Sequence, residues 1–512
     1  MKKSLLLIIS LFTVESISAG SYGDVYGAHP AANGMGNAVN ATSSGSAAVY
    51  YNVAGLGRLS AADLAVLDYE IATLEKQGNA KSKEDATKIT PPKGNKTETE
   101  KEKEKSDIDP TERQVIEEYL EHPFYIRTPL RVYDAFTKDL LVNRNLKRPN
   151  KVSHELSIQY NYAVPRLTTS APNPDRLLGE KDHYVGIGLA IDFGSIFNMD
   201  RKIKFGLNVL APASGNLLTV NDQNPTVHRA LQYGVENERP TIMGGLGVEA
   251  WKDHLYLGIG FTALASGQGS ILMKNVNISP DPVTPDQQAI LEIKPIVNPT
   301  FGAQFHWGKF DLGASYRRET MLSIDPLAAR AQTTLLAIQL DLDIALLGLF
   351  TPRVVSYGLA FHPTESWTLA LDINRELWSG FRISRTKRTY SEPFDLKDTT
   401  NYRFGIEYKW RPDWKFRTGC AIRPSPIGEL PGQTNWIDFN RTILTAGVGY
   451  VLFPDSFSFT DVLKNPLLID LVIEYQKLEG RNIYKYNPTA RNPNYSFGGN
   501  VWHAGISFSI LF

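Results

Sequence analysis

Hydrophobic and polar residues alternate along many segments between residue 154 and the end of the chain. In 400–411 the aromatic and aliphatic residues fall on even positions, whereas charged residues such as Arg403 and Glu407 fall on odd ones. The same period of two runs through 366–378 and 467–477. Because successive side chains of a strand point to opposite faces, this period predicts strands with one apolar face and one charged face.

Fourteen such segments follow one another, which is an even number, as closed antiparallel barrels require. They are predicted over 154–164, 182–194, 201–211, 240–251, 254–264, 292–307, 310–324, 337–362, 366–378, 400–411, 413–424, 440–452, 467–477 and 500–512. In a soluble sandwich the charged face of each strand would meet water. In a membrane barrel the apolar face meets lipid and the charges line the lumen.

The lengths of the connections favour the barrel. Most turns on one side are as short as 252–253, although 453–466 is longer, and the loops on the other side are long, such as 212–239, 265–291 and 478–499. Short turns at one end and long loops at the other are typical of outer-membrane barrels. A sandwich has no reason to separate its connections in this way.

Aromatic residues agree with this interpretation. Trp251, Trp307, Trp367, Trp410 and Trp414 all flank short turns, where the boundary between lipid headgroups and acyl chains would lie. The last predicted strand alternates apolar residues and ends in a phenylalanine, which resembles the C-terminal assembly signal of bacterial outer-membrane proteins. We therefore predict an all-β membrane protein, a 14-stranded antiparallel outer-membrane β-barrel.

The N-terminus predicts export. Lys2 and Lys3 precede an apolar stretch over 5–14 and a small-residue segment that ends at Ala19, the pattern of a secretory signal peptide over 1–19. A buried N-terminal helix is the alternative. The sequence contains no apolar run of 18 residues, which argues against an ordinary membrane-spanning helix. The predicted location is the bacterial outer membrane.

Composition divides the remaining chain into three parts. Residues 20–60 are rich in Gly, Ala, Ser and Asn and carry almost no charge, so we expect a compact segment packed against another part of the molecule. Residues 61–150 form a charged, low-complexity insert, disordered or solvated over 75–106 and helical over 111–141. Residues 151–512 form the barrel. The sequence assigns the insert no function.

Charge and motif content exclude several function classes. The 54 basic and 54 acidic residues cancel, so no global field draws the chain to nucleic acid. The single cysteine, Cys420, rules out an internal disulfide or a multi-cysteine metal site. His-Glu-x-x-His and Gly-x-Ser-x-Gly motifs are absent from the sequence. We expect no enzyme, no cofactor and no metal, although a Ser–His pair formed only in space stays open.

Four stretches, in order along the chain, resemble the FadL-type family of long-chain fatty acid transporters and their aromatic-hydrocarbon-uptake relatives. These are the run 32–56 with its Asn52-Val53-Ala54-Gly55-Leu56, then 352–381, 402–426 and 430–450. The family favours Asn-Pro-Ala-Gly-Leu in the first stretch, so Val53 replaces a proline. The resemblance covers 20–60 and 154–512 and leaves the charged insert outside.

The resemblance implies a barrel closed by an N-terminal plug (hatch) over 20–60. Asn52, Ala54 and Gly55 match the plug motif position by position and are the expected plug residues. The implied ligand is a hydrophobic small molecule, a fatty acid or a hydrocarbon. The other implied partners are outer-membrane lipid, lipopolysaccharide and the barrel-assembly machinery.

The family releases its cargo sideways, where the third strand kinks inward. In this chain the third predicted strand contains Gly206 and Asn208 and ends at Pro212, and glycine and proline are residues at which a strand can bend. We place the substrate path there. The alternative is that these residues mark the strand end only.

Three charged residues are expected to face the lumen: Glu407, Arg417 and Asp470. Pairing across the wall would offset the cost of their burial, and a fatty-acid carboxylate site is the alternative. Cys420 is expected on the lipid side of its strand. The predicted function is import of hydrophobic compounds, with a surface adhesin or phage receptor, or a general porin, as the alternatives.

Overall fold

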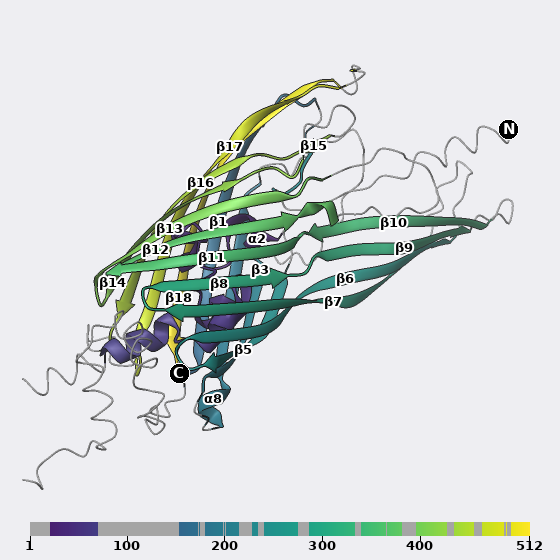
Figure 1. Ribbon diagram of the computed structural model, residues 1–512. Helices are drawn as coiled ribbons and strands as arrows, with labels where there is room; N and C mark the ends of the chain where they lie inside the picture. The colour runs from purple at the N-terminus through teal and green to yellow at the C-terminus, as the bar shows by residue number, and fades with distance from the viewer. Residues whose placement is uncertain are drawn as a thin grey trace, which may run out of the picture.

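The strands of the chain close into a β-barrel (Figure 1). The computed structural model describes residues 21–69, 153–172, 174, 180–197, 199, 201–213, 228–233, 240–274, 286–332, 339–364, 366–380, 396–427, 435–454, 463–485, 488 and 493–512. The predicted signal peptide and residues 70–150 of the predicted insert lie outside the described residues. In the described part, no helix is long and apolar enough to cross a membrane.

The main sheet contains sixteen strands, and the pairing of β6 with β7 closes fourteen of them into an antiparallel ring. The predicted fourteen-stranded barrel is thus confirmed. The ring strands are β1 (Glu155–Thr169), β2 (Asp182–Asp192), β3 (Ile203–Pro212), β5 (Thr241–Trp251), β6 (Leu255–Lys274), β7 (Asp286–Trp307), β8 (Phe310–Arg317), β11 (Arg353–Thr364), β12 (Trp367–Leu377), β13 (Thr399–Arg411), β14 (Trp414–Arg423), β16 (Arg441–Leu452), β17 (Leu467–Ile483) and β18 (Tyr495–Leu511). β1 pairs with β18, so the first and last strands meet.

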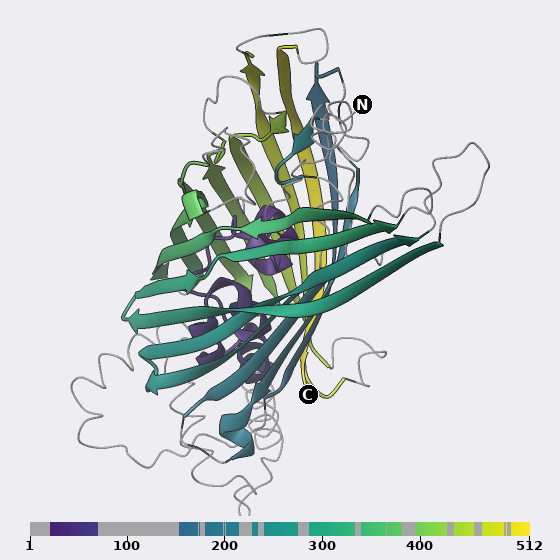
Figure 2. The same cartoon turned by 90° about the vertical axis from the view of Figure 1, so that its right-hand side faces the viewer.

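Two further strands leave the ring. β9 (Thr320–Gln332) and β10 (Gln339–Thr351) pair with each other, and β9 also pairs with β6 in parallel. The sequence predicted one strand over 310–324 and one over 337–362, and the structure divides both. The second division falls at Pro352, which has no N–H group for a ladder hydrogen bond. β6, β7, β9 and β10 project from the barrel together (Figure 2).

The predicted loops 265–291 and 478–499 are shorter in the structure, because strands extend into both. β6 continues to Lys274 and β7 starts at Asp286, while β17 continues to Ile483 and β18 starts at Tyr495. The added segments pair as ladders, with Lys274 opposite Asp286 and Ile483 opposite Tyr495. The short turns at the opposite end are found as predicted, for example at 308–309 between β7 and β8.

Alternation separates the two faces of the wall. Large apolar side chains on the outer face are exposed, among them Ile158, Ile187, Leu257, Ile259, Phe301, Leu312, Tyr357, Leu371, Phe404, Leu444, Leu471 and Ile473. The predicted tryptophans lie at strand ends beside the short turns, and Trp307 is 60% exposed. Cys420 is exposed on this outer face, whereas its neighbours Gly419 and Ala421 are buried. Such an apolar belt with aromatic edges matches lipid rather than water.

The segment from Ser21 onward lies inside the ring (Figure 2). It consists of α2 (Tyr22–Tyr26), α3 (Pro30–Gly34), η1 (Gly45–Ala47), α4 (Ala48–Tyr51) and η2 (Val53–Gly57). We call residues 21–57 the plug. Most of its residues are buried. The sequence analysis predicts this burial, because the segment is too small to build its own core.

A helix over 61–69 follows the plug, across the predicted boundary at residue 60. Ser60 and Asp63 cap it reciprocally, since the Ser60 N–H donates to Asp63 Oδ2 at 2.7 Å and the Asp63 N–H donates to Ser60 Oγ at 3.1 Å. Lys204 Nζ lies 2.7 Å from Asp63 Oδ2, and Lys409 Nζ lies 2.9 Å from Asp68 Oδ2. The start of the predicted insert is therefore tied to the barrel.

Candidate functional site: the plug inside the barrel

The plug backbone lies directly against the barrel wall. A Cβ atom added at Gly258 of β6 would lie 2.5 Å from the backbone nitrogen of Ala54, and one added at Gly302 of β7 would overlap the side chain of Asn52. Similar contacts recur on other strands, at Gly247, Gly313, Gly358, Gly405 and Gly419. Glycines facing the lumen thus let the plug approach the wall at backbone distance.

Asn52 ties the plug to two neighbouring strands. Its Nδ2 group donates to the carbonyl oxygens of Ala303 on β7 at 3.0 Å and of Ala314 on β8 at 3.3 Å. Its Oδ1 accepts from the Ala54 N–H at 3.2 Å and so caps η2. The expected plug residues Asn52, Ala54 and Gly55 are all buried at this contact.

Val53 keeps the geometry that a proline would favour. It is the first residue of η2, the position where proline is tolerated best, and Asn52 before it is extended with φ −158° and ψ 104°. The valine side chain also fills space, because a Cβ at Gly245 would lie 2.5 Å from its Cγ2 atom. The departure from the family motif therefore leaves this turn intact.

Polar side chains of the wall hold the plug at both ends. Near its start, Asp24 pairs with Arg317 of β8 and accepts from the Tyr50 hydroxyl at 2.7 Å. Burial raises the pKa of Asp24, but Arg317 and the hydrogen bonds from Tyr50 and Ser21 outweigh it and lower the pKa from 3.8 to about 2. Just past the end of the plug, Arg58 Nη2 lies 3.0 Å from Asp311 Oδ2.

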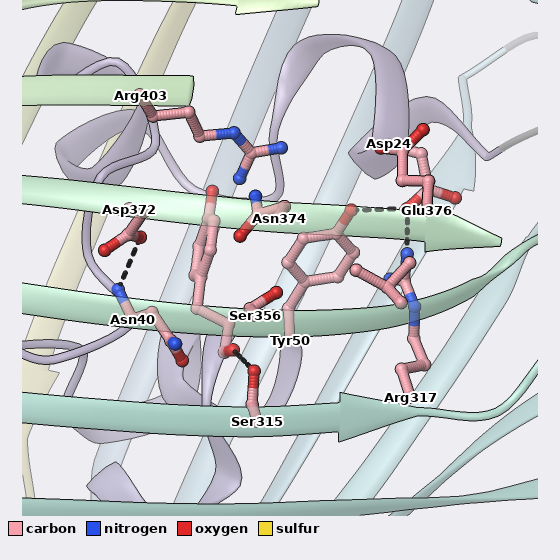
Figure 3. A pocket seen from close by; sticks show the side chains of 12 residues that line it. Asp24, Asn40, Tyr50, Ser315, Arg317, Ser356, Asp372, Asn374, Glu376 and Arg403 are labelled. Carbon is pink, nitrogen blue, oxygen red and sulfur yellow. Dashed lines mark hydrogen bonds and ion pairs between the residues drawn. The ribbon is translucent and has the colours of Figure 1, made fainter. Parts of the chain in front are cut away.

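A small polar cavity lies between the plug and the wall (Figure 3). It measures about 50 Å³ and is lined by Asp24, Asn40, Tyr50, Tyr51, Ser315, Arg317, Val354, Ser356, Asp372, Asn374, Glu376 and Arg403. The side-chain amide of Asn40 is buried there without a hydrogen-bond partner. Because a water needs roughly 10–15 Å³ of such volume, the cavity suits a few waters rather than a large apolar ligand.

The predicted lumen-facing residues form one network. Arg417 Nε lies 2.6 Å from Glu407 Oε2, and Arg417 Nη1 lies 2.5 Å from Asp470 Oδ1. Gly34 of the plug packs on the Arg417 side chain. Both carboxylates are paired across β13, β14 and β17, so the arrangement favours structural pairing over a free carboxylate site.

The ladder of the third strand is continuous past Gly206 and Asn208 to Pro212. β3 pairs with β2 without a register shift from Lys204 to Pro212, and with β5 from Ile203 to Leu210. Gly206 instead makes room for the plug, because a Cβ there would lie 2.5 Å from Val49 Cγ2. The glycine that suggested a kink serves close packing, and the sequence cannot distinguish these two uses.

On the long-loop side of the plug, aromatic side chains gather. Tyr22 stacks on Tyr184 of β2 with ring centroids 3.8 Å apart, and Tyr26 lies edge-on to Tyr233 at 6.5 Å. Phe439 packs edge-on against Phe497 at 5.2 Å. We call these six residues the aromatic cluster.

Two loop segments fold into the lumen to complete this cluster, which the sequence analysis missed. β4 (Arg229–Ala230) and β15 (Trp436–Ile437) pair in parallel there. The buried Arg441 donates to Gln232, and to the Tyr233 hydroxyl at 3.3 Å. The loops carry no periodic pattern, so only the apolar residues among polar ones, such as Leu231, offer a signal.

Comparison with known proteins finds a similar family over part of the chain. Residues 300–462, from β7 to the connection after β16, match the sequence profile described as outer membrane protein transport protein (OMPP1/FadL/TodX). The matched segment is similar to this outer-membrane family. A comparison with curated protein sequences finds no match. The described residues contain no group of three or more His, Cys, Asp or Glu side chains placed to hold a metal.

Solved structures similar to this chain have low sequence identity. A FadL homologue of Pseudomonas aeruginosa is 15% identical, with 70% of this chain and 89% of that chain covered and a TM-score of 0.42. The CymD monoaromatic hydrocarbon channel is 14% identical, with 70% and 88% covered and a TM-score of 0.39. The toluene transporter TodX of Pseudomonas putida is 14% identical, with 70% and 90% covered and a TM-score of 0.36.

Proposed function

We propose that this chain takes up hydrophobic small molecules, such as long-chain fatty acids or aromatic hydrocarbons, across the outer membrane. One observation carries the proposal: the plug fills the lumen at backbone contact with the wall, and aromatic side chains occupy the space on its long-loop side. Aromatic rings bind apolar molecules through large contact areas and remove them from water. The match of residues 300–462 to a family of outer-membrane transport proteins supports this proposal.

The two alternatives account for less of this arrangement. A general porin needs a continuous water-filled lumen, whereas the glycine contacts of the plug leave no room beside Ala54 and Asn52. An adhesin or phage receptor needs exposed loops but has no use for a buried plug held by wall side chains. The plug therefore favours controlled passage of cargo.

Release sideways into the membrane is part of the proposal, since an apolar cargo would lose its burial in a polar lumen. The unbroken β2–β3 pairing argues against an exit beside β3. The β7–β8 ladder, by contrast, ends at the pair Thr300 and Arg317. Arg317 is the last residue of β8, and the chain then continues as β9.

Beyond that point, two hydrogen bonds among the described side chains and backbone groups join the two sides of the seam between β7 and β9. Asn298 Nδ2 donates to Thr320 Oγ1 at 2.8 Å, and the Arg318 N–H donates to the Pro299 carbonyl at 3.3 Å. Pro299 itself has no N–H to donate. We place the proposed exit at this seam.

Uptake assays test the function. Cells of a host without its own fatty-acid transporter, expressing this chain, should accumulate radiolabelled oleate or toluene faster than cells with an empty vector. Liposome swelling in small sugars provides the polar control and should stay slow. Fast swelling without uptake of either apolar compound would favour the porin and refute the proposal.

A pair of cross-links tests the exit. In a Cys420→Ala background, Asn298→Cys with Thr320→Cys joins β7 to β9, and Ile187→Cys with Val209→Cys joins β2 to β3 at a paired position. Oxidation should block uptake in the first variant only, and a reductant should restore it. Blockage by the β2–β3 link alone would instead return the exit to β3.

A further inference from the structure

One turn at the short-turn end of the barrel differs from its neighbours. The turns at 252–253, 308–309 and 412–413 are tight and carry polar or charged residues or a proline. The connection between β2 and β3 spans residues 193–202 and contains the helix α8 (Phe193–Ile196), which lies beyond the ends of these strands (Figure 1).

This connection exposes large apolar side chains. Ile196 is 50% exposed, Phe197 is 68% exposed and Met199 is 47% exposed. Asp192 caps α8 through its side chain, which accepts from the Ser195 N–H at 3.1 Å. The N–H groups of Phe197 and Met199 donate to the carbonyls of Phe193 at 2.9 Å and Gly194 at 2.7 Å. Exposed large apolar residues so close together in the chain are typical of a contact surface.

The exposed residues continue the lipid-facing surface of the barrel. Phe205 lies on the outer face of β3, because its neighbours Lys204 and Gly206 face the lumen. The Phe193 ring lies 6.4 Å from the Phe205 ring and 6.1 Å from the Phe197 ring. An unbroken aromatic path therefore runs from the acyl-chain region of the wall to the tip of the turn.

We propose that the β2–β3 turn is a membrane anchor, with Ile196, Phe197 and Met199 inserted at the headgroup boundary of the inner leaflet. Phe193 follows the last residue of β2, the level at which other strands carry their girdle tryptophans. Aromatic and aliphatic side chains favour this boundary because it buries their apolar parts. Arg201, exposed at the end of the turn, adds a cation that phosphate headgroups attract.

Three single-cysteine proteins in phospholipid vesicles test the anchor by spin labelling. The native Cys420 reports the acyl-chain region, since it is exposed on the outer face of β14. Phe197→Cys and Lys309→Cys, each with Cys420→Ala, report the β2–β3 turn and a tight polar turn. The measurement compares collisions of each nitroxide with oxygen, which prefers lipid, and with a water-soluble nickel chelate.

The label at position 197 should collide with the nickel chelate at least fivefold less than the label at 309, and with oxygen more. Equal nickel access at 197 and 309 would overturn the anchor, because the vesicles contain no protein partner to cover the turn. A second variant, Phe197→Glu with Met199→Glu, should fold to the same heat-modifiable barrel and lower the oxygen collisions of a label placed at Ile196→Cys. Unchanged oxygen collisions in that variant would also count against lipid contact.

Discussion

The two ends of the plug meet the barrel in different ways. From Gly34 to Gly57 the contacts are between backbone atoms and wall glycines such as Gly258 and Gly419. From Tyr22 to Tyr26 the contacts are between side chains, both rings and the Asp24 pair with Arg317, and the ring centroids of Tyr22 and Tyr184 lie 3.8 Å apart. One end is thus packed by atoms that cannot rearrange without moving the chain, and the other by side chains that have alternative rotamers.

This difference indicates that the two parts of the plug have different roles. Close-packed backbone resists small changes in volume, whereas aromatic side chains can turn aside and make room for a ligand. In the proposed function, cargo enters among the aromatic cluster and the glycine-packed end remains a floor beneath it. The ion pairs of Asp24 with Arg317 and of Arg58 with Asp311 hold the plug in the barrel.

The largest effect is expected from adding a side chain to the floor. Gly258→Val would place atoms against the backbone of Val53 and Ala54, and such overpacking costs roughly 1–3 kcal/mol or more. The plug should be displaced from the barrel wall, while the ring of strands stays folded. Single-channel recordings in planar bilayers should then show a several-fold rise in conductance.

Gly480→Val is the matched control, because the nearest atom to a Cβ at Gly480 is 3.8 Å away. It should conduct like wild type. If Gly258→Val folds normally and shows the same conductance as Gly480→Val, the position of the plug does not depend on backbone contact with β6.

Acid should loosen the opposite end of the plug. The pKa of Asp24 is lowered from 3.8 to about 2 in the folded state, so its pairing stabilises the plug above about pH 4 and this contribution is lost as the pH falls toward 2. The shift corresponds to about 2 kcal/mol. Wild-type channels should therefore open more often near pH 2.5 than at pH 7.

Asp24→Asn isolates the cause. It lacks the charge at every pH, so its opening frequency should be raised at pH 7 and should change little on acidification. An unaltered acid response in Asp24→Asn would assign the pH dependence to another group.

The ring of strands follows from sequence pattern because lipid outside and polar groups inside impose a strict period of two. The prediction failed where that constraint ends. In the predicted loops, β6, β7 and β17 run on as strands, and at Pro352 one predicted strand becomes two. Strand continuation in water depends on partners that the local pattern does not reveal.

The site was harder to predict, because the same residue types serve several purposes. Gly206 looks identical in sequence whether it bends a strand or clears space for Val49. Arg441 holds Gln232 and Tyr233 in the lumen, a contact between segments more than two hundred residues apart. Composition indicated a segment packed against another part of the molecule, but only the family motif around Asn52 indicated a plug inside a barrel, since its small residues have no periodic pattern.

Substitutions in the aromatic cluster should change the affinity for cargo rather than the conductance of the barrel. Tyr22→Ala removes the ring that stacks on Tyr184. In the proposed function the cargo contacts this ring, and a ring contact contributes about 0.5–1.5 kcal/mol, so binding of oleate to purified protein should weaken up to about tenfold. Tyr22→Phe is the control, because the Tyr22 hydroxyl is buried without a hydrogen-bond partner. A weaker affinity in both variants would mean that the ring itself is not the contact.

The smallest effect is expected from restoring the family's proline at the floor. Val53 is the first residue of η2, where a missing N–H costs nothing to the helix, and Asn52 before it is already extended. Val53→Pro should therefore raise the free energy of unfolding by at most about 1 kcal/mol, through the unfolded chain, and leave uptake unchanged. Val53→Gly, which removes the packing beside Gly245, should lower it by about 1.5–3 kcal/mol instead. Urea midpoints of the two variants measure the difference. Destabilisation by proline as large as by glycine would mean that the valine side chain, not the backbone of this turn, holds the floor in place.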